Sequence, residues 1–306
     1  MVFSSSECIT MLAVQTAESV LIVTFNFVTI LAFIKRRFLR QQSMYLVVNL
    51  AVADMLVGGF SEPLTAFFEI RKWCNIWNGT QGLAVRWFRV IFPITSLINL
   101  AAISVERAHA TLRPFKQRVV TKRFYKVVVV ACWSTAVLLA VIFVTIPHIN
   151  EAGKSDYFYL WNSFNVCSLL VICVSYALLA AKIYCGRHPQ QHGAFRRETK
   201  LTKTLLLVTI LSLLMWLPYV ITTFLYFGTD VFSSLSWLTN RRLNFVGIVF
   251  YYANSLVNPI LYASKMPDFR RALISLFPPR FQLQGHVLPV NRQLPVQHNQ
   301  VHQLSS

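Results

Sequence analysis

The sequence predicts an all-α membrane protein: a bundle of seven transmembrane helices followed by a short amphipathic eighth helix. Hydrophobic residues make up 55% of the 306 positions and charged residues only 13%, whereas soluble proteins carry about 25% charged residues. Seven apolar stretches each have the roughly 20 residues that a helix needs to cross a bilayer. Most Lys and Arg residues lie on one side of these stretches. Together these observations exclude a soluble enzyme and a disordered protein.

The seven apolar stretches fill most of the chain and are joined by short connections. A soluble helical core would need amphipathic helices with charged faces, and these stretches lack such faces. In chain order, the predicted spans cover residues 11–34, 43–70, 81–108, 125–146, 158–183, 202–227 and 243–262.

The segment after the last span is typical of a short helix on the inner membrane surface. Apolar residues that include Phe269 and Leu273 alternate with Arg270 and Arg271 at a helical spacing, which predicts an amphipathic helix. The polar tail that follows is expected to be disordered. The predicted division is an extracellular N-terminus (1–10), the bundle (11–264), the eighth helix (265–277) and a cytoplasmic tail (278–306).

The distribution of basic residues predicts the orientation. Of the 29 Lys and Arg residues, 22 lie on the side reached after spans one, three, five and seven, and such an excess marks the cytoplasmic side. The N-terminus is therefore expected outside. The net charge of +18 then comes mainly from basic residues on the cytoplasmic side, which face anionic lipid. No nucleic-acid partner is expected.

Two features belong to the predicted outer side. Asn78 begins an Asn-Gly-Thr sequon in the first outer loop, which predicts glycosylation. Cys8 and Cys74 are the cysteines placed outside the cell. The sequence leaves open whether they form a disulfide.

Several polar residues lie at a similar depth inside the spans. An ionisable group in hydrocarbon costs about 3 kcal/mol or more on insertion scales, so it is a functional candidate. An oxygen-rich pocket at this depth would suit a small hard cation, and a hydrogen-bond network that fixes helix packing is the alternative. The residues are Asn26, Asp54, Ser96, Asn254, Ser255 and Asn258.

Span three places three polar side chains on one face. Arg107 lies 18 residues after Arg89 and Ser96 lies seven residues after it, which correspond to about five and two turns at 3.6 residues per turn. Arg107 has two candidate partners near the cytoplasm, its neighbour Glu106 and Glu198 at the start of span six. A pair with Glu198 would be a switch that frees span six when it opens, and a static ion pair is the alternative.

Prolines within the spans predict kinks, because each removes a backbone hydrogen bond. Pro218 lies in span six and Pro259 in span seven. Trp216, two residues before Pro218, is placed to sense a ligand, although tryptophan is also common as simple packing.

Taken in order, these motifs identify the chain as resembling rhodopsin-like (class A) G protein-coupled receptors over residues 11–277. Asn26 and Trp133 fit the family's positions in spans one and four. The motifs similar to NLxxAD, E/DRY, CWxP and NPxxY are Asn49-Leu50-Ala51-Val52-Ala53-Asp54, Glu106-Arg107-Ala108, Met215-Trp216-Leu217-Pro218 and Asn258-Pro259-Ile260-Leu261-Tyr262.

The resemblance implies a multi-pass plasma-membrane receptor, not an enzyme, that binds an extracellular ligand and activates a heterotrimeric G protein by outward movement of helix six. It implies no cofactor apart from an allosteric sodium ion, held by Asp54, Ser96, Asn254, Ser255 and Asn258. It also implies an ionic lock between Arg107 and Glu198. Tyr176 and Tyr262 resemble the tyrosines that stabilise the active form.

The sequence departs from the family pattern at several positions. Gly82 stands near the usual outer cysteine of span three, Ala108 replaces the motif tyrosine, and Ser212 replaces a connector phenylalanine. Span five lacks its usual proline, with Ser168 near that position. Short outer loops without the usual disulfide resemble the melanocortin, adenosine and lipid-receptor branch.

The outer ends of the spans suggest the ligand class. Arg89 stands where an amine receptor resembling this family would carry an aspartate, and Arg86 and Arg89 together favour an anionic ligand group. The alternative is that Glu62 or Glu69 neutralises them in a structural pair. The predicted ligand site comprises Glu62, Arg86, Arg89, Tyr219, Thr223, Asn244 and Tyr252.

A transporter or channel of seven helices is the rival function. That class predicts internal repeats, broken helices or a continuous polar path across the membrane. The sequence shows no internal repeat, and its buried polar residues cluster at one depth, so a receptor is favoured.

Overall fold

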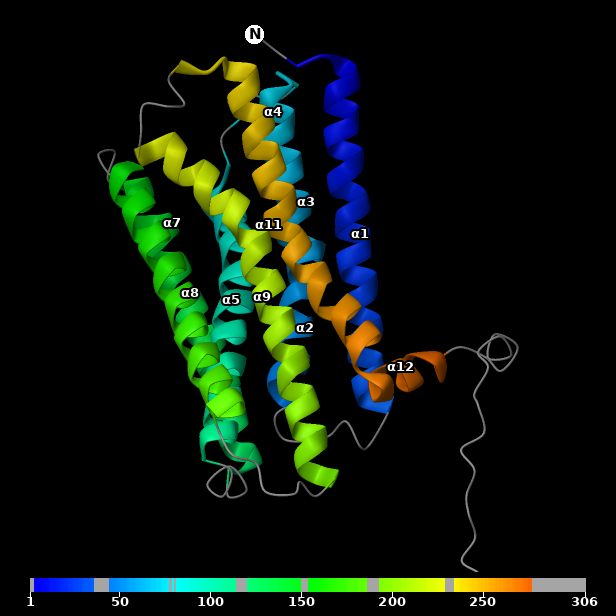
Figure 1. The fold of residues 1–306 in the computed structure, drawn as a ribbon. Helices are drawn as coiled ribbons and strands as arrows, with labels where there is room; N and C mark the ends of the chain where they lie inside the picture. Colours follow the sequence, from blue (N-terminus) through cyan, green and yellow to red (C-terminus); the bar gives the residue numbers. More distant parts are fainter. Residues whose placement is uncertain are drawn as a thin grey trace, which may run out of the picture.

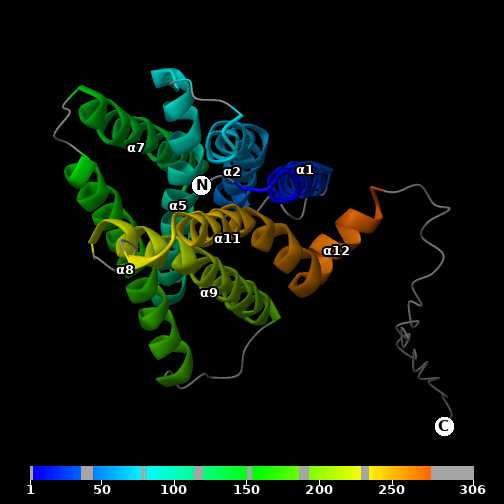
Figure 2. The ribbon, with the colours of Figure 1, turned by 90° about the horizontal axis from the view of Figure 1, so that it is seen from above.

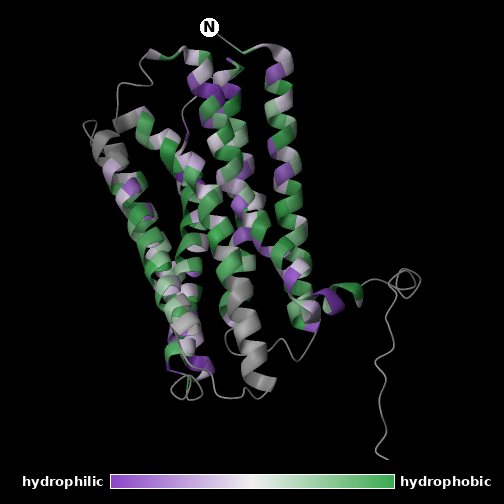
Figure 3. Cartoon of the chain, in the orientation of Figure 1, coloured by the Kyte–Doolittle hydropathy of each residue, from purple (hydrophilic) through white to green (hydrophobic). Residues whose placement is uncertain are grey.

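The computed structural model shows a bundle of long helices, with the short helix α12 turning away from the end of α11 (Figures 1 and 2). Apolar residues run along most of the length of the helices, and polar residues concentrate toward their ends (Figure 3). The predicted fold class is confirmed. The structure describes residues 3–35, 44–76, 79, 81–113, 120–149, 154–185, 193–228 and 234–276.

Within these described residues, six helical segments are long and apolar enough to cross a membrane. The predicted sixth span lies within the continuous helix α9, which contains the apolar segment Ile210–Tyr226. The long helices are α1 (Ser5–Lys35), α2 (Met44–Leu56), α5 (Leu83–Leu112), α7 (Lys122–Ile149), α8 (Lys154–Cys185), α9 (Gly193–Gly228) and α11 (Trp237–Lys265).

Helix α1 begins six residues before the start of the predicted apolar stretch. Its first turn is closed by a reciprocal cap, in which the Ser4 hydroxyl accepts a hydrogen bond from the Glu7 N–H. The Glu7 carboxylate in turn accepts from the Ser4 N–H at 3.1 Å. This is a capping box, a local signal that acts independently of hydropathy.

The second span is not one regular α-helix. After α2, a π-helical turn η2 (Val57–Ser61) leads into α3 (Glu62–Thr65), which is followed by a second π-helical turn η3 (Ala66–Ile70) and the short α4 (Arg71–Trp73). Pro63 has no N–H, and its ring crowds the carbonyl four residues earlier. The chain accommodates it by widening the preceding turn, where the Glu62 N–H donates to the carbonyl of Val57. Each π turn changes which neighbour the following side chains face.

Close packing of η2 on α1 depends on Gly58. A Cβ atom at this position would lie 2.6 Å from Cγ2 of Ile22, which is completely buried. The Ser19 hydroxyl also donates to the Gly58 carbonyl at 2.6 Å. Because Gly58 has no Cβ atom, α1 and the second span can pack this closely.

Replacing Gly58 with alanine is expected to lower the free energy of unfolding by about 1–3 kcal/mol, the usual cost of overpacking. Gly59→Ala is the matched control, because the nearest atom to its added Cβ is 3.9 Å away on Val23. The control is expected to be neutral or stabilising, since alanine favours helix by up to about 1 kcal/mol. Melting temperatures of the purified variants would measure both effects, and equal values for the two variants would contradict the prediction.

The outer ends of α1, α4 and α11 are tied together. A disulfide joins Cys8 to Cys74, which settles the pairing that the sequence left open. The Arg242 guanidinium pairs with Glu7 at 2.6 Å. Phe3 packs on Trp237, with ring centroids 5.6 Å apart. The N-terminal turn is thus part of the packed bundle.

The predicted eighth helix is present as α12 (Pro267–Ile274). Its apolar side is anchored by Phe269, which is 1% exposed and packs against Phe33 of α1 and Tyr262 of α11. Arg270 and Arg271 lie on its exposed side. The predicted end at residue 277 lies outside the described residues.

Candidate functional site

The first candidate site surrounds the carboxylate of Asp54, which is completely buried. One carboxylate oxygen, Oδ1, accepts hydrogen bonds from the hydroxyls of Ser96 on α5, at 2.7 Å, and Ser255 on α11, at 3.0 Å. The other, Oδ2, accepts from the side-chain amide of Asn258 at 2.7 Å. Three helices therefore converge on one negative charge, and each hydrogen-bond donor is a neutral group.

Further oxygen atoms near this carboxylate lack partners. Asn254 and Asn258 are 2% and 1% exposed, and the Oδ1 atom of each has no hydrogen bond. Asn26 borders the site, since its amide donates to the backbone carbonyl of Ser255 at 3.0 Å. A buried carboxylate beside unpartnered amide oxygens is the donor set that a hard cation prefers.

The second candidate site surrounds Arg89 near the outer end of α5. Its Nη1 donates to Oε1 of Glu69 at 3.0 Å and to Oε1 of Gln81 at 2.7 Å. Its Nε donates to the Thr65 hydroxyl at 3.2 Å, and this hydroxyl is 2.7 Å from that of Tyr252. The Arg89 side chain keeps 21% of its surface exposed, so this cluster is partly open at the surface of the bundle.

The other predicted ligand residues differ in how they relate to Arg89. Tyr219 on α9 interacts electrostatically with the Arg89 guanidinium. Thr223 lies one turn further along α9 and donates to the Tyr219 carbonyl at 2.7 Å. Arg86 and Asn244 are half-buried, and Arg86 forms no ion pair within the described part of the chain. Gln81 and Thr65 were missed, because neither polar side chain carries a motif.

Of the two candidate partners of the arginines, Glu69 is confirmed for Arg89, and the place of Glu62 in the ligand site stays a prediction. Glu69 pairs with Arg89, whereas Glu62 is completely buried and faces Glu18 of α1. Glu69 lies within the π turn η3, whose wider turn separates the direction in which Glu69 points from that of Glu62. Glu18 was also missed, although an ionisable residue inside the first span was a signal.

At the inner end of α5, Arg107 pairs with its neighbour Glu106 through two hydrogen bonds. The Tyr125 hydroxyl on α7 donates to the same carboxylate at 2.9 Å. The side chain of Glu198 lies outside the described residues, so its pairing with Arg107 stays a prediction. Arg107 is 3% exposed, which places the charge inside the bundle.

Aromatic contacts connect the outer site to the middle of the bundle. Tyr219 packs on Tyr251 with centroids 4.6 Å apart, and Tyr251 packs on Trp216 at 4.8 Å. Trp216 is 2% exposed and lies two residues before Pro218 in α9.

Further along α11, Pro259 lies within the helix, three residues before Tyr262. Tyr262 and Tyr176 are both buried, and the two side chains interact electrostatically. Both tyrosines are thus buried in the half of the bundle opposite the N-terminus.

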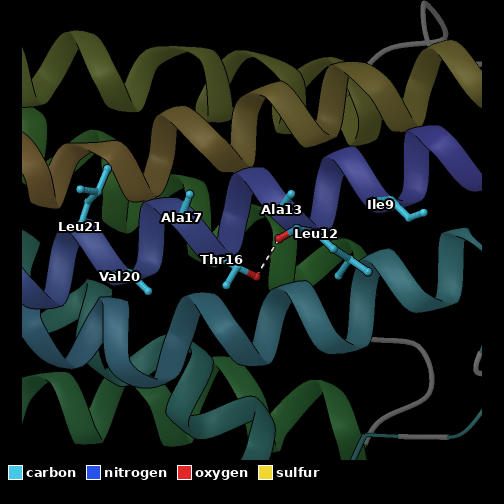
Figure 4. A pocket seen from close by; sticks show the side chains of 7 residues that line it. All are labelled: Ile9, Leu12, Ala13, Thr16, Ala17, Val20 and Leu21. Atoms are coloured by element: carbon cyan, nitrogen blue, oxygen red, sulfur yellow. Dashed lines mark hydrogen bonds between the residues drawn. The ribbon is translucent and has the colours of Figure 1, made fainter.

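An apolar hollow lies along the flank of α1 (Figure 4). Its single polar side chain, Thr16, is satisfied by donating to the Leu12 carbonyl at 2.7 Å. The lining carries no charge, so this hollow does not resemble the two polar sites. It is lined by Ile9, Leu12, Ala13, Thr16, Ala17, Val20 and Leu21. The predicted glycosylation site, Asn78, lies outside the described residues.

Comparison with known proteins identifies a common domain. The family described as "7 transmembrane receptor (rhodopsin family)" matches residues 25–262. Neuropeptide FF receptor 2 of Mus musculus is 25% identical over 84% of this chain and 70% of its own length. Melanopsin of Felis catus is 27% identical over 83% of this chain and 57% of its own length. Octopamine receptor beta-1R of Drosophila melanogaster is 29% identical over 84% of this chain and 60% of its own length. The chain thus spans less than two thirds of the length of melanopsin and of octopamine receptor beta-1R.

Proposed function

Since the chain belongs to the rhodopsin family of seven-transmembrane receptors, and is thus a G protein-coupled receptor rather than an enzyme, we propose that its ligand binds at the Arg89 cluster. We also propose that ligand binding moves α9 and so activates the G protein. The family and the apolar helices make it a multi-pass protein of the plasma membrane. We further propose that the N-terminus is extracellular, because the basic residues collect at the opposite ends of the spans. Which branch of the family it is nearest stays a prediction.

The proposed ligand site is the Arg89 cluster together with Arg86. The observation that carries this proposal is the hydrogen-bonded link from Arg89 through Thr65 to Tyr252 of α11, whose neighbour Tyr251 packs on Tyr219 of α9. A ligand that contacts this cluster therefore touches the two helices that must move relative to each other. Agonist binding shifts the equilibrium only by its differential affinity for the two states.

We propose that the ligand carries an anionic group such as a carboxylate or phosphate. Glu69 supplies one negative charge to this cluster, against the positive charges of Arg86 and Arg89. An anionic group would bind Arg86 and compete with Glu69 for Arg89. One relative is named for the amine octopamine. A protonated amine would be repelled by Arg89, so this chain is not expected to share that ligand class.

For the conformational step, we propose that α9 pivots outward about Pro218. Trp216 couples the ligand site to this proline through Tyr251. At the inner end, Arg107 would leave Glu106, open the predicted contact with Glu198, and contact the G protein. Tyr176 and Tyr262 are placed to support the rearranged arginine.

The Asp54 site is proposed to hold a sodium ion that stabilises the inactive state. The fit rests on a single carboxylate with neutral donors and on the unpartnered oxygens of Asn254 and Asn258. When bound, the ion would supply the positive charge that balances Asp54. Ser96 and Ser255 orient the carboxylate that would receive it.

The functional class and ligand class can be tested in one assay. Cells expressing the protein would be screened with lipid, peptide and nucleoside libraries, and nucleotide exchange on co-expressed G proteins would be measured. Activation by anionic compounds is the expected outcome. Ion flux in the absence of nucleotide exchange would instead support a transporter or channel and contradict the proposal.

Replacing Arg89 with alanine is expected to lower the potency of such an anionic agonist by about 10- to 100-fold, because a hydrogen bond to a charged group contributes about 1.5–3 kcal/mol. Dose–response curves for G-protein activation would measure the change. Arg242→Ala is the control, since this outer arginine pairs with Glu7 outside the cluster. An agonist that is equally potent on Arg89→Ala and on the unmodified receptor would exclude Arg89 from the site.

A further inference from the structure

Two glutamates face each other inside the bundle, in the half that contains the N-terminus. Glu18 of α1 and Glu62 of α3 are 7% and 0% exposed. The two carboxyl groups interact with each other. None of their four oxygen atoms has a hydrogen-bond donor. No Lys, Arg or His side chain in the described part of the chain pairs with either group.

This arrangement is unstable without an added positive charge. Two carboxylates in contact repel each other, and each has lost the water that stabilised its charge. Breaking a buried ion pair by removing one partner is strongly destabilising, and here two like charges lack any such partner. The pair must therefore take up a cation or a proton.

A third side chain adds an unused ligand atom to the same place. Gln15 is 1% exposed, and neither its amide oxygen nor its amide nitrogen has a partner. It precedes Glu18 by three residues, so the two lie on the same face of α1. Helical side chains lean toward the N-terminal turn, which brings the Glu18 carboxylate over the turn that carries Gln15. This face of α1 thus carries three unpartnered oxygen atoms, from Gln15 and Glu18, and Glu62 of α3 adds two more.

We propose that Glu18, Glu62 and Gln15 form a second cation site, which takes a hard divalent cation such as calcium. Carboxylate and amide oxygens are the ligands that such ions prefer. The described residues contain no cluster of three or more His, Cys, Asp or Glu side chains, which argues against zinc. The two carboxylates match a divalent charge, whereas the lone Asp54 carboxylate matches a monovalent one.

The second site is separate from the Asp54 site. Glu62 lies eight residues beyond Asp54, which is about 12 Å along a helix at 1.5 Å per residue. The two sites also share no hydrogen-bonding side chain. The proposal therefore does not rest on the ligand or sodium assignments made above.

The test measures the melting temperature of the purified full-length protein in nanodiscs as calcium or magnesium chloride is titrated against a chelator. Choline chloride keeps the ionic strength constant. The unmodified protein is expected to show a saturable rise. Glu62→Gln should weaken the apparent cation affinity by at least about tenfold. Even the loss of a residue that only hydrogen-bonds a metal ligand lowers metal affinity by about that factor or more. Asp54→Asn and the control Glu7→Gln should keep the full response.

A second measurement distinguishes loss of cation binding from a folding defect in the variants. Binding of radiolabelled calcium, counted by equilibrium dialysis, should fall by one ion per protein in Glu62→Gln and in the double variant Glu18→Gln, Glu62→Gln. In chelator, both variants should melt no lower than the unmodified protein, because they carry no uncompensated buried charge.

Three results would overturn the proposal. The unmodified protein could show no response to either divalent cation, or Glu62→Gln could keep the response in full. A melting temperature that depends on pH but on neither metal would show that the carboxyl groups share a proton instead. Loss of the response in Asp54→Asn with retention in Glu62→Gln would assign the divalent cation to the first site.

Discussion

Replacing Asp54 with asparagine is expected to abolish the effect of sodium on the stability of the receptor. The buried carboxylate is the only negative charge among the groups that meet at this site, where Ser96, Ser255 and Asn258 donate to it. Asparagine keeps the shape and removes the charge that attracts the ion. At a sodium concentration about ten times the Kd, the unmodified protein should gain about 1.4 kcal/mol, seen as a rise of a few degrees in melting temperature when sodium replaces choline.

The control for this prediction is Glu7→Gln, which removes a carboxylate from the outer surface and should leave the sodium response unchanged. Ser96→Ala should weaken the response without abolishing it, because one orienting hydrogen bond is lost while the charge remains. In sodium-free buffer, Asp54→Asn should melt at least as high as the unmodified protein, since an uncompensated buried charge is gone. The same sodium-dependent rise in Asp54→Asn would place the ion elsewhere.

Removing the disulfide with the double variant Cys8→Ser, Cys74→Ser is expected to lower the free energy of unfolding by about 2–4 kcal/mol. The bridge closes a chain segment of 66 residues, and cross-links that close long loops restrict the unfolded chain most. It also holds the first turn of α1 in place, where Glu7 pairs with Arg242 and Phe3 packs on Trp237. Thermal melting under non-reducing conditions would measure the loss.

A reducing agent should destabilise the unmodified protein by the same amount and leave the double variant unchanged. Cys167→Ser is the matched control, because this cysteine is free and exposed, and it should melt like the unmodified protein. Identical melting of the double variant and the unmodified protein would show that the bridge contributes nothing.

Helical periodicity predicted the arrangement of α5 well. The spacing of Arg89, Ser96 and Arg107 placed all three on one face, and the structure turns Ser96 and Arg107 inward and Arg89 toward Glu69. This helix keeps a regular α-helical backbone from Leu83 to Leu112 even across Pro93. A regular helix preserves the angular relation between distant residues, so sequence spacing is a sufficient guide.

The same reasoning failed in the second span. Glu62 and Glu69 are seven residues apart, close to two turns at about 3.6 residues per turn, and an ideal helix would point both toward one neighbour. The structure directs Glu62 to α1 and Glu69 to α5, because the π turn η3, which has a different number of residues per turn, begins between them. The sequence therefore left two candidates for the partner of Arg89, and only the folded chain distinguishes them.

By itself, the sequence determined the membrane-spanning helical class, the family and the depth of the buried polar residues. These properties follow from hydropathy and local spacing, which each segment carries alone. The tertiary structure decided which side chains meet: Cys8 with Cys74, Arg89 with Glu69, and Glu18 with Glu62. Such pairings depend on how each helix is rotated and where its turns widen. Those choices are settled by close packing between helices, as where Gly58 meets Ile22.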